Sequence, residues 1–137
     1  MNEKKNIYFE EKKLVLHEDE RGSLFEVIRF HDDNIPGNGQ LYVFSIHPNR
    51  RRGDHYHKLK KEWFTCVYGS CDLLLRSKND MFSVIKMDFH YPKIIYVPPY
   101  TVHALVNNNS EPCSIISYSS TQHDEQNPDT YFQRASE

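Results

Sequence analysis

Residues 52–62 read Arg-Gly-Asp-His-Tyr-His-Lys-Leu-Lys-Lys-Glu, and this stretch governs the interpretation of the whole chain. In an extended strand, residues two apart point to the same side, so His55 and His57 direct two imidazoles into one space. Glu62 follows after a short turn and can return on the next strand. The stretch therefore offers three ligands of mixed nitrogen and oxygen type to a metal ion.

A second segment, residues 96–107, reads Tyr-Val-Pro-Pro-Tyr-Thr-Val-His-Ala-Leu-Val-Asn and adds a third imidazole, His103, just past a rigid proline turn. Three histidines and a glutamate suit Zn, Fe, Mn, Ni or Co, so the identity of a divalent transition metal stays open. The alternative is that His55 and His57 are interior residues held by hydrogen bonds, with Glu62 a surface charge beside the lysine-rich run 58–61. The residues alone leave both interpretations open.

Short runs of β-forming residues flank these two segments, and their lengths are typical of strands rather than helices. Turn-forming residues separate the runs, with Pro, Gly, Asn and Asp at 34–39, 69–70, 78–80, 98–99 and 107–110. This spacing predicts an all-β fold, an antiparallel sandwich or barrel. A short helix is expected only at 130–135. The predicted strands are 24–28, 41–46, 64–68, 73–75, 82–87, 94–97, 104–106 and 114–118.

The size of the chain, 137 residues and 16.3 kDa, predicts a single domain over residues 1–137. Its aromatic content of 13% favours a β-rich core, because flat rings pack well on a pleated surface. Residues 1–18 are expected to form a peripheral N-terminal extension and residues 121–137 a peripheral tail. Because such folds leave edge strands, we expect a homodimer in which the N-terminal segment crosses to the partner.

Charge and composition exclude several classes of protein. Seventeen Lys and Arg residues against 19 Asp and Glu give a net charge of −2, which cannot hold nucleic acid non-specifically. The chain has neither an apolar run of about 18 residues nor a signal-peptide pattern, so a cytoplasmic protein without membrane contact is expected. The cysteines, which form no Cys-x-x-Cys pair, are expected to be buried thiols; they are Cys66, Cys71 and Cys113.

The two histidine segments resemble the two motifs of the cupin superfamily, G-x₅-H-x-H-x₃₋₄-E-x₆-G and G-x₅-P-x-G-x₂-H-x₃-N. The resemblance implies a cupin β-barrel or jelly roll and assigns the metal-ligand positions to the three histidines and the glutamate. Three glycine positions of the motifs are replaced, by Asn49, Pro92 and Tyr100, which puts the turn conformations in question. The matching residues are His55, His57, Glu62, Gly69, Pro98, His103 and Asn107.

Three further pieces resemble enzymes that act on nucleotide-linked 4-keto-6-deoxy sugars, notably the dTDP-4-dehydrorhamnose 3,5-epimerases. Residues 19–25 are similar to their D-x-R-G-x-F opening, residues 52–56 to R-G-x-H-Y-Q, and residues 118–121 to Y-K-T-T. The resemblance implies His55 as the catalytic base, Tyr118 as the acid, and Arg52 as a ligand of the substrate diphosphate. The distant C-terminal Asp that orients the base in those enzymes has no counterpart here.

The C-terminal cupin domain of bifunctional capsular polysaccharide enzymes is also similar, in R-G-x-H-Y-H-x₄-E and in the tail Asn-Pro-Asp-Thr-Tyr-Phe at 127–132. It implies metal binding and epimerisation at C3 of a 4-keto sugar nucleotide during synthesis of O-antigen, lipopolysaccharide or capsule, with action at C5 left open. Sugar 3,4-ketoisomerases are similar as well but have one residue fewer before the Glu. The alternatives are thus a ketoisomerase and a non-catalytic cupin that binds a metal or a sugar.

The expected chemistry needs a base, an acid and a stabiliser of negative charge. His55 or His57 would be the base and Tyr118 the acid, while a metal or the protonated partner histidine would stabilise the enolate. Arg21 and Arg52 would clamp the diphosphate as bidentate donors, the alternative being that both are surface residues. If His55 binds a metal it cannot also be the base, so these two roles compete.

Overall fold

The computed structural model describes residues 7–135, and in this range the chain forms strands and no helix. The predicted all-β class is therefore confirmed. No segment of this range is a helix long and apolar enough to cross a membrane. The strands are β1 (Glu10–Lys13), β2 (His17–Asp19), β3 (Gly22–Leu24), β4 (Gln40–Ile46), β5 (Arg50–Tyr56), β6 (Glu62–Tyr68), β7 (Ser70–Arg76), β8 (Phe82–Asp88), β9 (Lys93–Val97), β10 (Val102–Asn107), β11 (Cys113–Ser119) and β12 (Tyr131–Phe132).

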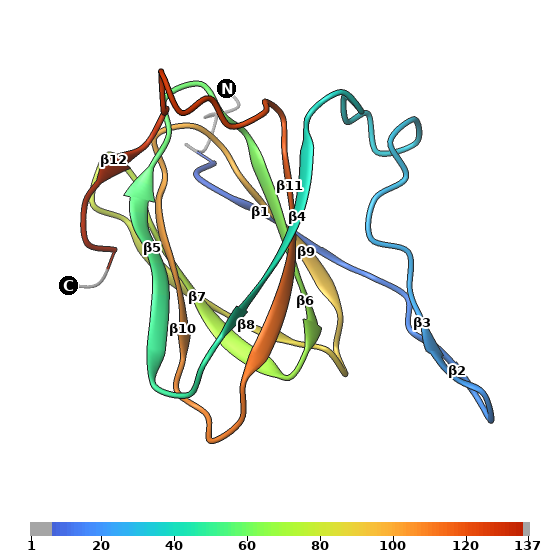
Figure 1. The fold of residues 1–137 in the computed structure, drawn as a ribbon. Coiled ribbons are helices and arrows are strands. Elements are labelled where there is room, and N and C mark those ends of the chain that lie inside the picture. The colour runs from blue at the N-terminus through green and yellow to red at the C-terminus, as the bar shows by residue number, and fades with distance from the viewer. Residues whose placement is uncertain (1–6, 136–137) are drawn as a thin grey trace, which may run out of the picture.

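Two five-stranded antiparallel sheets face each other, one in the order β1-β9-β6-β11-β4 and the other in the order β12-β5-β10-β7-β8 (Figure 1). They form a jelly roll whose sheets do not close into a continuous barrel. Alternating residues of the strands fill the space between the sheets, as the two-residue period of a strand requires. The fully buried core includes Leu73, Leu75, Met87, Ile95 and Ile115.

Two of the replaced motif glycines lie in the left-handed backbone region. Asn49 has a φ of 61° and Tyr100 a φ of 70°, so the turns keep the conformation that glycine normally provides. Gly53 also has a positive φ, of 104°, and a Cβ there would lie 2.7 Å from the carbonyl oxygen of His103. The close approach of β5 and β10 at this point brings their two histidines together.

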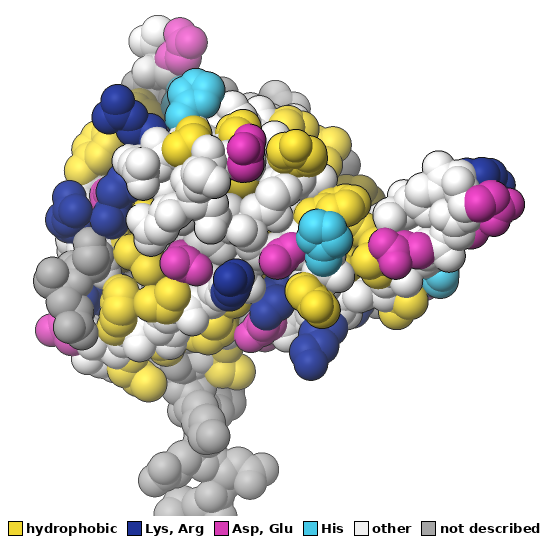
Figure 2. Space-filling view, turned by 90° about the horizontal axis from the view of Figure 1, so that it is seen from below, with side chains coloured by type: hydrophobic (Ala, Val, Ile, Leu, Met, Phe, Trp, Pro, Cys, Tyr) yellow, Lys and Arg dark blue, Asp and Glu magenta, His cyan; other side chains and the backbone are white. Residues whose placement is uncertain are grey.

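A hairpin made of β2 and β3 projects from the body of the molecule (Figures 1 and 2). Its strands pair only with each other. The predicted strand at 24–28 is wrong beyond its first residue, because β3 ends at Leu24 and residues 25–28 form no strand. An isolated two-stranded hairpin of this kind is only marginally stable in water.

Parts of the predicted N-terminal extension and C-terminal tail pair with the two sheets as edge strands. β1 pairs with β9 from Glu10 opposite Tyr96 to Lys13 opposite Lys93. The helix predicted at 130–135 is wrong, because β12 instead pairs with β5, whose edge offers unpaired backbone groups. The rest of the predicted extension and tail, residues 1–6 and 136–137, lies outside the described residues.

Candidate active site

Four side chains meet between the two sheets, and they are the four that the sequence predicted as ligands. His55 lies on β5, His57 follows directly after it, Glu62 begins β6 and His103 lies on β10. One potential ligand atom from each lies within 4.8 Å of all the others. The interpretation of Glu62 as a surface charge is wrong, because this residue is only 2% exposed.

The ligand atoms of three of these residues converge closely. Nε2 of His57 lies 2.6 Å from Oε1 of Glu62, and Nε2 of His103 lies 3.3 Å from the same oxygen. None of the three atoms has a partner with hydrogen-bond geometry among the described residues. Buried polar atoms normally have hydrogen-bond partners, so a cation bound between these three atoms would supply the interaction that they lack.

The other ring nitrogens of two histidines fix this orientation. Nδ1–H of His57 donates to the carbonyl oxygen of Asp129 over 2.5 Å, and Nδ1–H of His103 donates to the carbonyl oxygen of Thr101 over 3.0 Å. These bonds assign the proton to Nδ1 and leave Nε2 to face Glu62, the arrangement by which metal-binding histidines are usually held. His55 has no hydrogen bond to its ring within residues 7–135.

Burial and mutual charge set the protonation states of the cluster. Burial raises the pKa of Glu62, but His57 and His103 beside it outweigh this and hold the pKa well below its ordinary value. Burial lowers the pKa of His57, yet the Glu62 carboxylate leaves that pKa raised overall. Burial, together with repulsion from His103 and His57, lowers the pKa of His55 to about 4. His55 is therefore a neutral imidazole at neutral pH.

Tyr42 is a residue of this cluster that the sequence analysis missed. Its hydroxyl donates to Oε2 of Glu62 over 2.7 Å. Burial, and to a smaller extent the negative charge of Glu62, raises the pKa of Tyr42. The hydroxyl is therefore protonated and donates to the carboxylate oxygen that the two histidines do not face. The alternation of β4 places Tyr42 and Phe44 on the same inner face, a pattern that could have identified it.

A cavity of 260 Å³ opens beside the cluster between β4 and β5. Arg52 lies in its wall, where Nε–H donates to the carbonyl oxygen of Ser45 over 3.0 Å and the guanidinium lies 5.7 Å from the centre of the Phe44 ring. The cavity combines an apolar lining with a few converging polar groups, as small-molecule sites do. The lining residues are Tyr42, Phe44, Arg52, Gly53, His55, Glu62, Phe64, His103 and Leu105.

Arg21 lies at the turn of the projecting hairpin and does not line this cavity. Its guanidinium pairs with the Asp19 carboxylate at 2.6 Å, and its side chain is 84% exposed. Within one chain, the structure therefore brings Arg52 but not Arg21 to the histidine cluster.

Tyr118 does not face the histidine cluster, contrary to the expectation that it supplies the catalytic acid. Its ring packs against Phe30 and Trp63 on the outer face of its sheet. Its hydroxyl donates to the carbonyl oxygen of Pro36 and accepts from the backbone N–H of Gly39. The preceding residue on β11 points to the inner face instead, so the side-chain alternation of the strand excludes Tyr118 from the cavity.

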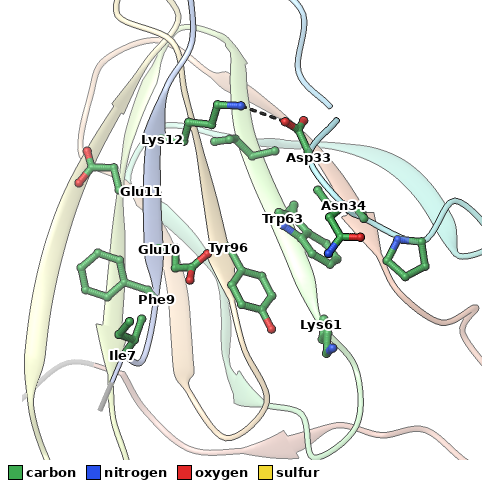
Figure 3. A pocket seen from close by; sticks show the side chains of 13 residues that line it. Ile7, Phe9, Glu10, Glu11, Lys12, Asp33, Asn34, Lys61, Trp63 and Tyr96 are labelled. Atoms are coloured by element: carbon green, nitrogen blue, oxygen red, sulfur yellow. Dashed lines mark hydrogen bonds and ion pairs between the residues drawn. The ribbon is translucent and has the colours of Figure 1, made fainter. Parts of the chain in front are cut away.

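The same outer face carries a larger hollow of 820 Å³ (Figure 3). Trp63 and Tyr96 form its floor, stacked on each other with ring centres 4.9 Å apart, and an ion pair between Lys12 and Asp33 crosses one end. The charged residues of the hollow include Glu10, Glu11 and Asp33, and the histidine cluster lies in the inner cavity instead.

Comparison with known families gives a match over residues 17–131 to the family described as the polysaccharide biosynthesis C-terminal domain. The chain belongs to this family.

A curated relative, the UDP-2-acetamido-2,6-beta-L-arabino-hexul-4-ose reductase of Pseudomonas aeruginosa, is 28% identical over 117 residues, which are 85% of this chain and 30% of the relative. The crystal structure of CapF, a capsular polysaccharide assembling protein from Staphylococcus aureus, is 27% identical with a TM-score of 0.69, over 88% of this chain and 34% of CapF. The chain thus spans about a third of the length of these two relatives.

Two further solved structures share the fold at lower identity. ChmJ, a 3'-monoepimerase from Streptomyces bikiniensis, is 16% identical with a TM-score of 0.80, over 91% of this chain and 69% of ChmJ. QdtA, a sugar 3,4-ketoisomerase from Thermoanaerobacterium thermosaccharolyticum, is 19% identical with a TM-score of 0.77, over 93% of this chain and 89% of QdtA. These similarities confirm the predicted jelly-roll fold.

Proposed function

We propose that this protein is a sugar-nucleotide epimerase that acts at C3 of a nucleotide-linked 4-keto-6-deoxyhexose during synthesis of a surface polysaccharide. One observation carries the proposal: a neutral, unbonded imidazole, His55, lines a cavity beside a buried carboxylate and two oriented histidines. Membership of the polysaccharide biosynthesis C-terminal domain family supports the substrate class.

The chemistry requires a proton to leave C3 and another to return from the opposite face. A ketone at C4 makes the C3 proton acidic, and its removal by His55 would give an enolate. Tyr42 comes from the facing sheet and lines the same cavity, so its hydroxyl is the donor we assign to the other face in place of Tyr118. Base and acid then approach the sugar ring from opposite sheets.

A divalent transition metal such as Zn, Ni, Fe or Mn would be held by His57, Glu62 and His103. Their converging, unsatisfied ligand atoms fit such an ion, and three protein ligands are the usual number at a catalytic site. When bound, the ion would act as a Lewis acid toward the negative charge that develops on the sugar. With three ligands, the His55 ring would stay free to act as the base.

The diphosphate of the substrate is assigned to Arg52 at the cavity wall. Only Nε of its guanidinium is engaged by a hydrogen bond within the described chain, so the remaining donors can face a phosphate. The hairpin carries Arg21 away from the cavity of its own chain. In the homodimer that we propose, this arm would lie against the partner, and Arg21 would be available to a substrate bound there.

Solvent hydrogen exchange tests the proposal. In D₂O with a dTDP-, UDP- or GDP-linked 4-keto-6-deoxyhexose, we expect deuterium at C3 and signals of the C3 epimer. His55→Ala should abolish the exchange, whereas His90→Ala, a change at a histidine 72% exposed outside the site, should leave it intact. A 3-keto product would indicate a ketoisomerase instead. No deuterium uptake with any of the three nucleotides would contradict catalysis and favour a binding module.

A further inference from the structure

The side-chain carboxylate of Asp129 binds the C-terminal tail to the turn that follows His57. The backbone N–H groups of Lys58, Leu59 and Lys60 donate to the Asp129 side chain over 2.8, 2.8 and 2.9 Å. Three successive backbone donors form a small anion-binding nest, which makes this a strong local attachment. Burial raises the pKa of Asp129, but these three bonds outweigh it and lower the pKa overall, so the carboxylate is charged at neutral pH.

The same residue reaches into the active site with its backbone. The carbonyl oxygen of Asp129 accepts the Nδ1–H of His57, whose Nε2 faces Glu62. Asp129 therefore connects the outer turn and the buried imidazole through its two oxygen-bearing groups. If the tail moved away, Nδ1 of His57 would lose this acceptor, and the ring would be free to turn or to change tautomer.

The residues that follow Asp129 run along β5 beside the histidine cluster. Tyr131 stacks on Tyr56 with ring centres 5.3 Å apart and an interplanar angle of 22°. The Phe132 ring meets the His55 ring edge to face at 6.3 Å. The backbone N–H of Gln133 donates to the carbonyl oxygen of Asp54. The tail thus contacts His55 and His57, two of the three histidines that the mechanism uses.

We propose that Asp129 is a positioning residue of the active site, whose carboxylate holds the tail so that its carbonyl fixes the His57 ring for metal binding. The inference deepens the proposed function and rests on it for its catalytic meaning. Outer partners of this kind typically change metal affinity about 10- to 100-fold when removed. A tail that served only to stabilise the fold would leave the His57 ring as it is.

Two variants and one control separate these possibilities. Asp129→Ala removes the attachment, and Asp129→Asn keeps an acceptor oxygen without the charge. The control is Asp124→Ala, which changes a tail carboxylate that accepts a hydrogen bond from the nearby Gln126 N–H. Zinc affinity is measured by calorimetry. The Nδ1–H proton of His57 is followed by NMR in histidine-labelled protein, with its exchange against water as the readout.

We expect Asp129→Ala to weaken zinc binding about 10-fold and to expose the Nδ1–H proton to exchange, with smaller effects for Asp129→Asn and none for Asp124→Ala. A lower melting temperature for Asp129→Ala with zinc affinity and proton protection both unchanged would overturn the inference. If Asp129→Ala does not fold, the same comparison is made with Asp129→Asn. If the wild-type protein binds no zinc, proton protection alone decides. Neither readout needs a substrate, so failure of the epimerase proposal is seen separately, in the exchange experiment at C3.

Discussion

Nε2 of His57 lies 2.6 Å from Oε1 of Glu62, and both side chains are almost completely excluded from water. Charges in such surroundings are costly unless they are paired, so each of the two groups depends on the other. The pair also prepares the site for a cation, because a charged carboxylate and an oriented imidazole are ligands that a transition metal prefers.

Glu62→Gln should therefore reduce both stability and metal affinity. Removing one partner of a buried ion pair typically costs about 3–5 kcal/mol, and the amide in this variant should place the loss at the lower end of that range. We expect urea denaturation of the metal-free protein to show this loss and zinc titration to show binding at least about 10-fold weaker. Glu125→Gln, at an exposed position of the tail, is the control and should change neither quantity. Equal zinc affinity in wild type and Glu62→Gln would contradict the metal site.

Tyr42 and Tyr118 should respond in opposite ways to the loss of a hydroxyl. Tyr42→Phe removes the donor to Glu62 inside the cavity, and we expect it to slow formation of the C3 epimer by about 100-fold or more. Deuterium exchange at C3 should slow less, because the base can still return deuterium to the original face.

Tyr118→Phe should leave turnover unchanged and lower the free energy of unfolding by about 1 kcal/mol, because the hydrogen bonds of its hydroxyl with Pro36 and Gly39 are lost. Epimer formation measured by NMR and denaturation curves check both variants. A large loss of turnover in Tyr118→Phe with normal stability would return the acid role to that residue.

The Asp54 carboxylate should give the protein a pH-dependent contribution to stability. Burial raises its pKa, but the bonds from Arg51 and from the backbone N–H of Ala135 outweigh this and hold the pKa below its ordinary value. A depressed carboxyl pKa stabilises the fold above the unfolded value of about 4, and this stabilisation is lost as the pH falls through the folded value.

We expect Asp54→Asn to be less stable than wild type by about 0.5–1 kcal/mol at neutral pH, since the group is partly exposed, and the difference should shrink below about pH 4. Asn is the suitable replacement because residue 54 has a φ of 58°, which Asn tolerates. Thermal denaturation over a pH series measures the difference. A difference that persists unchanged in acid would show that the charge of Asp54 does not contribute.

The projecting hairpin predicts a homodimer. Leu24 on the hairpin is 61% exposed, and the edge strand β4 exposes Leu41 and Val43 at 64% and 65%, which is unusual for neighbouring apolar side chains on a lone chain. We expect sedimentation at micromolar concentration to give a dimer and Leu24→Arg to shift it toward the monomer. Val84→Arg, at an exposed position of the other sheet, should not. A wild-type monomer would contradict the prediction.

The cluster of three histidines and a glutamate, and most of the strands, could be predicted from the sequence. His55 and His57 could be placed on one side because strand geometry is local, and the apolar runs from β6 to β11 each coincide with a strand for the same reason. The replaced glycines left the turns at Asn49 and Tyr100 open, and the structure shows that the backbone keeps positive φ at both positions.

Tertiary structure decided which tyrosine reaches the cavity and where the two ends go. Side chains on a strand alternate, so a shift of one residue in register moves Tyr118 from the inner face to the outer face, and register depends on the neighbouring strands. The tail became a strand because the edge of β5 lacked a partner, and β2 and β3 formed a hairpin that projects from the body. These outcomes depend on contacts between residues far apart in the chain, whereas the histidine motif depends on residues that are neighbours in it.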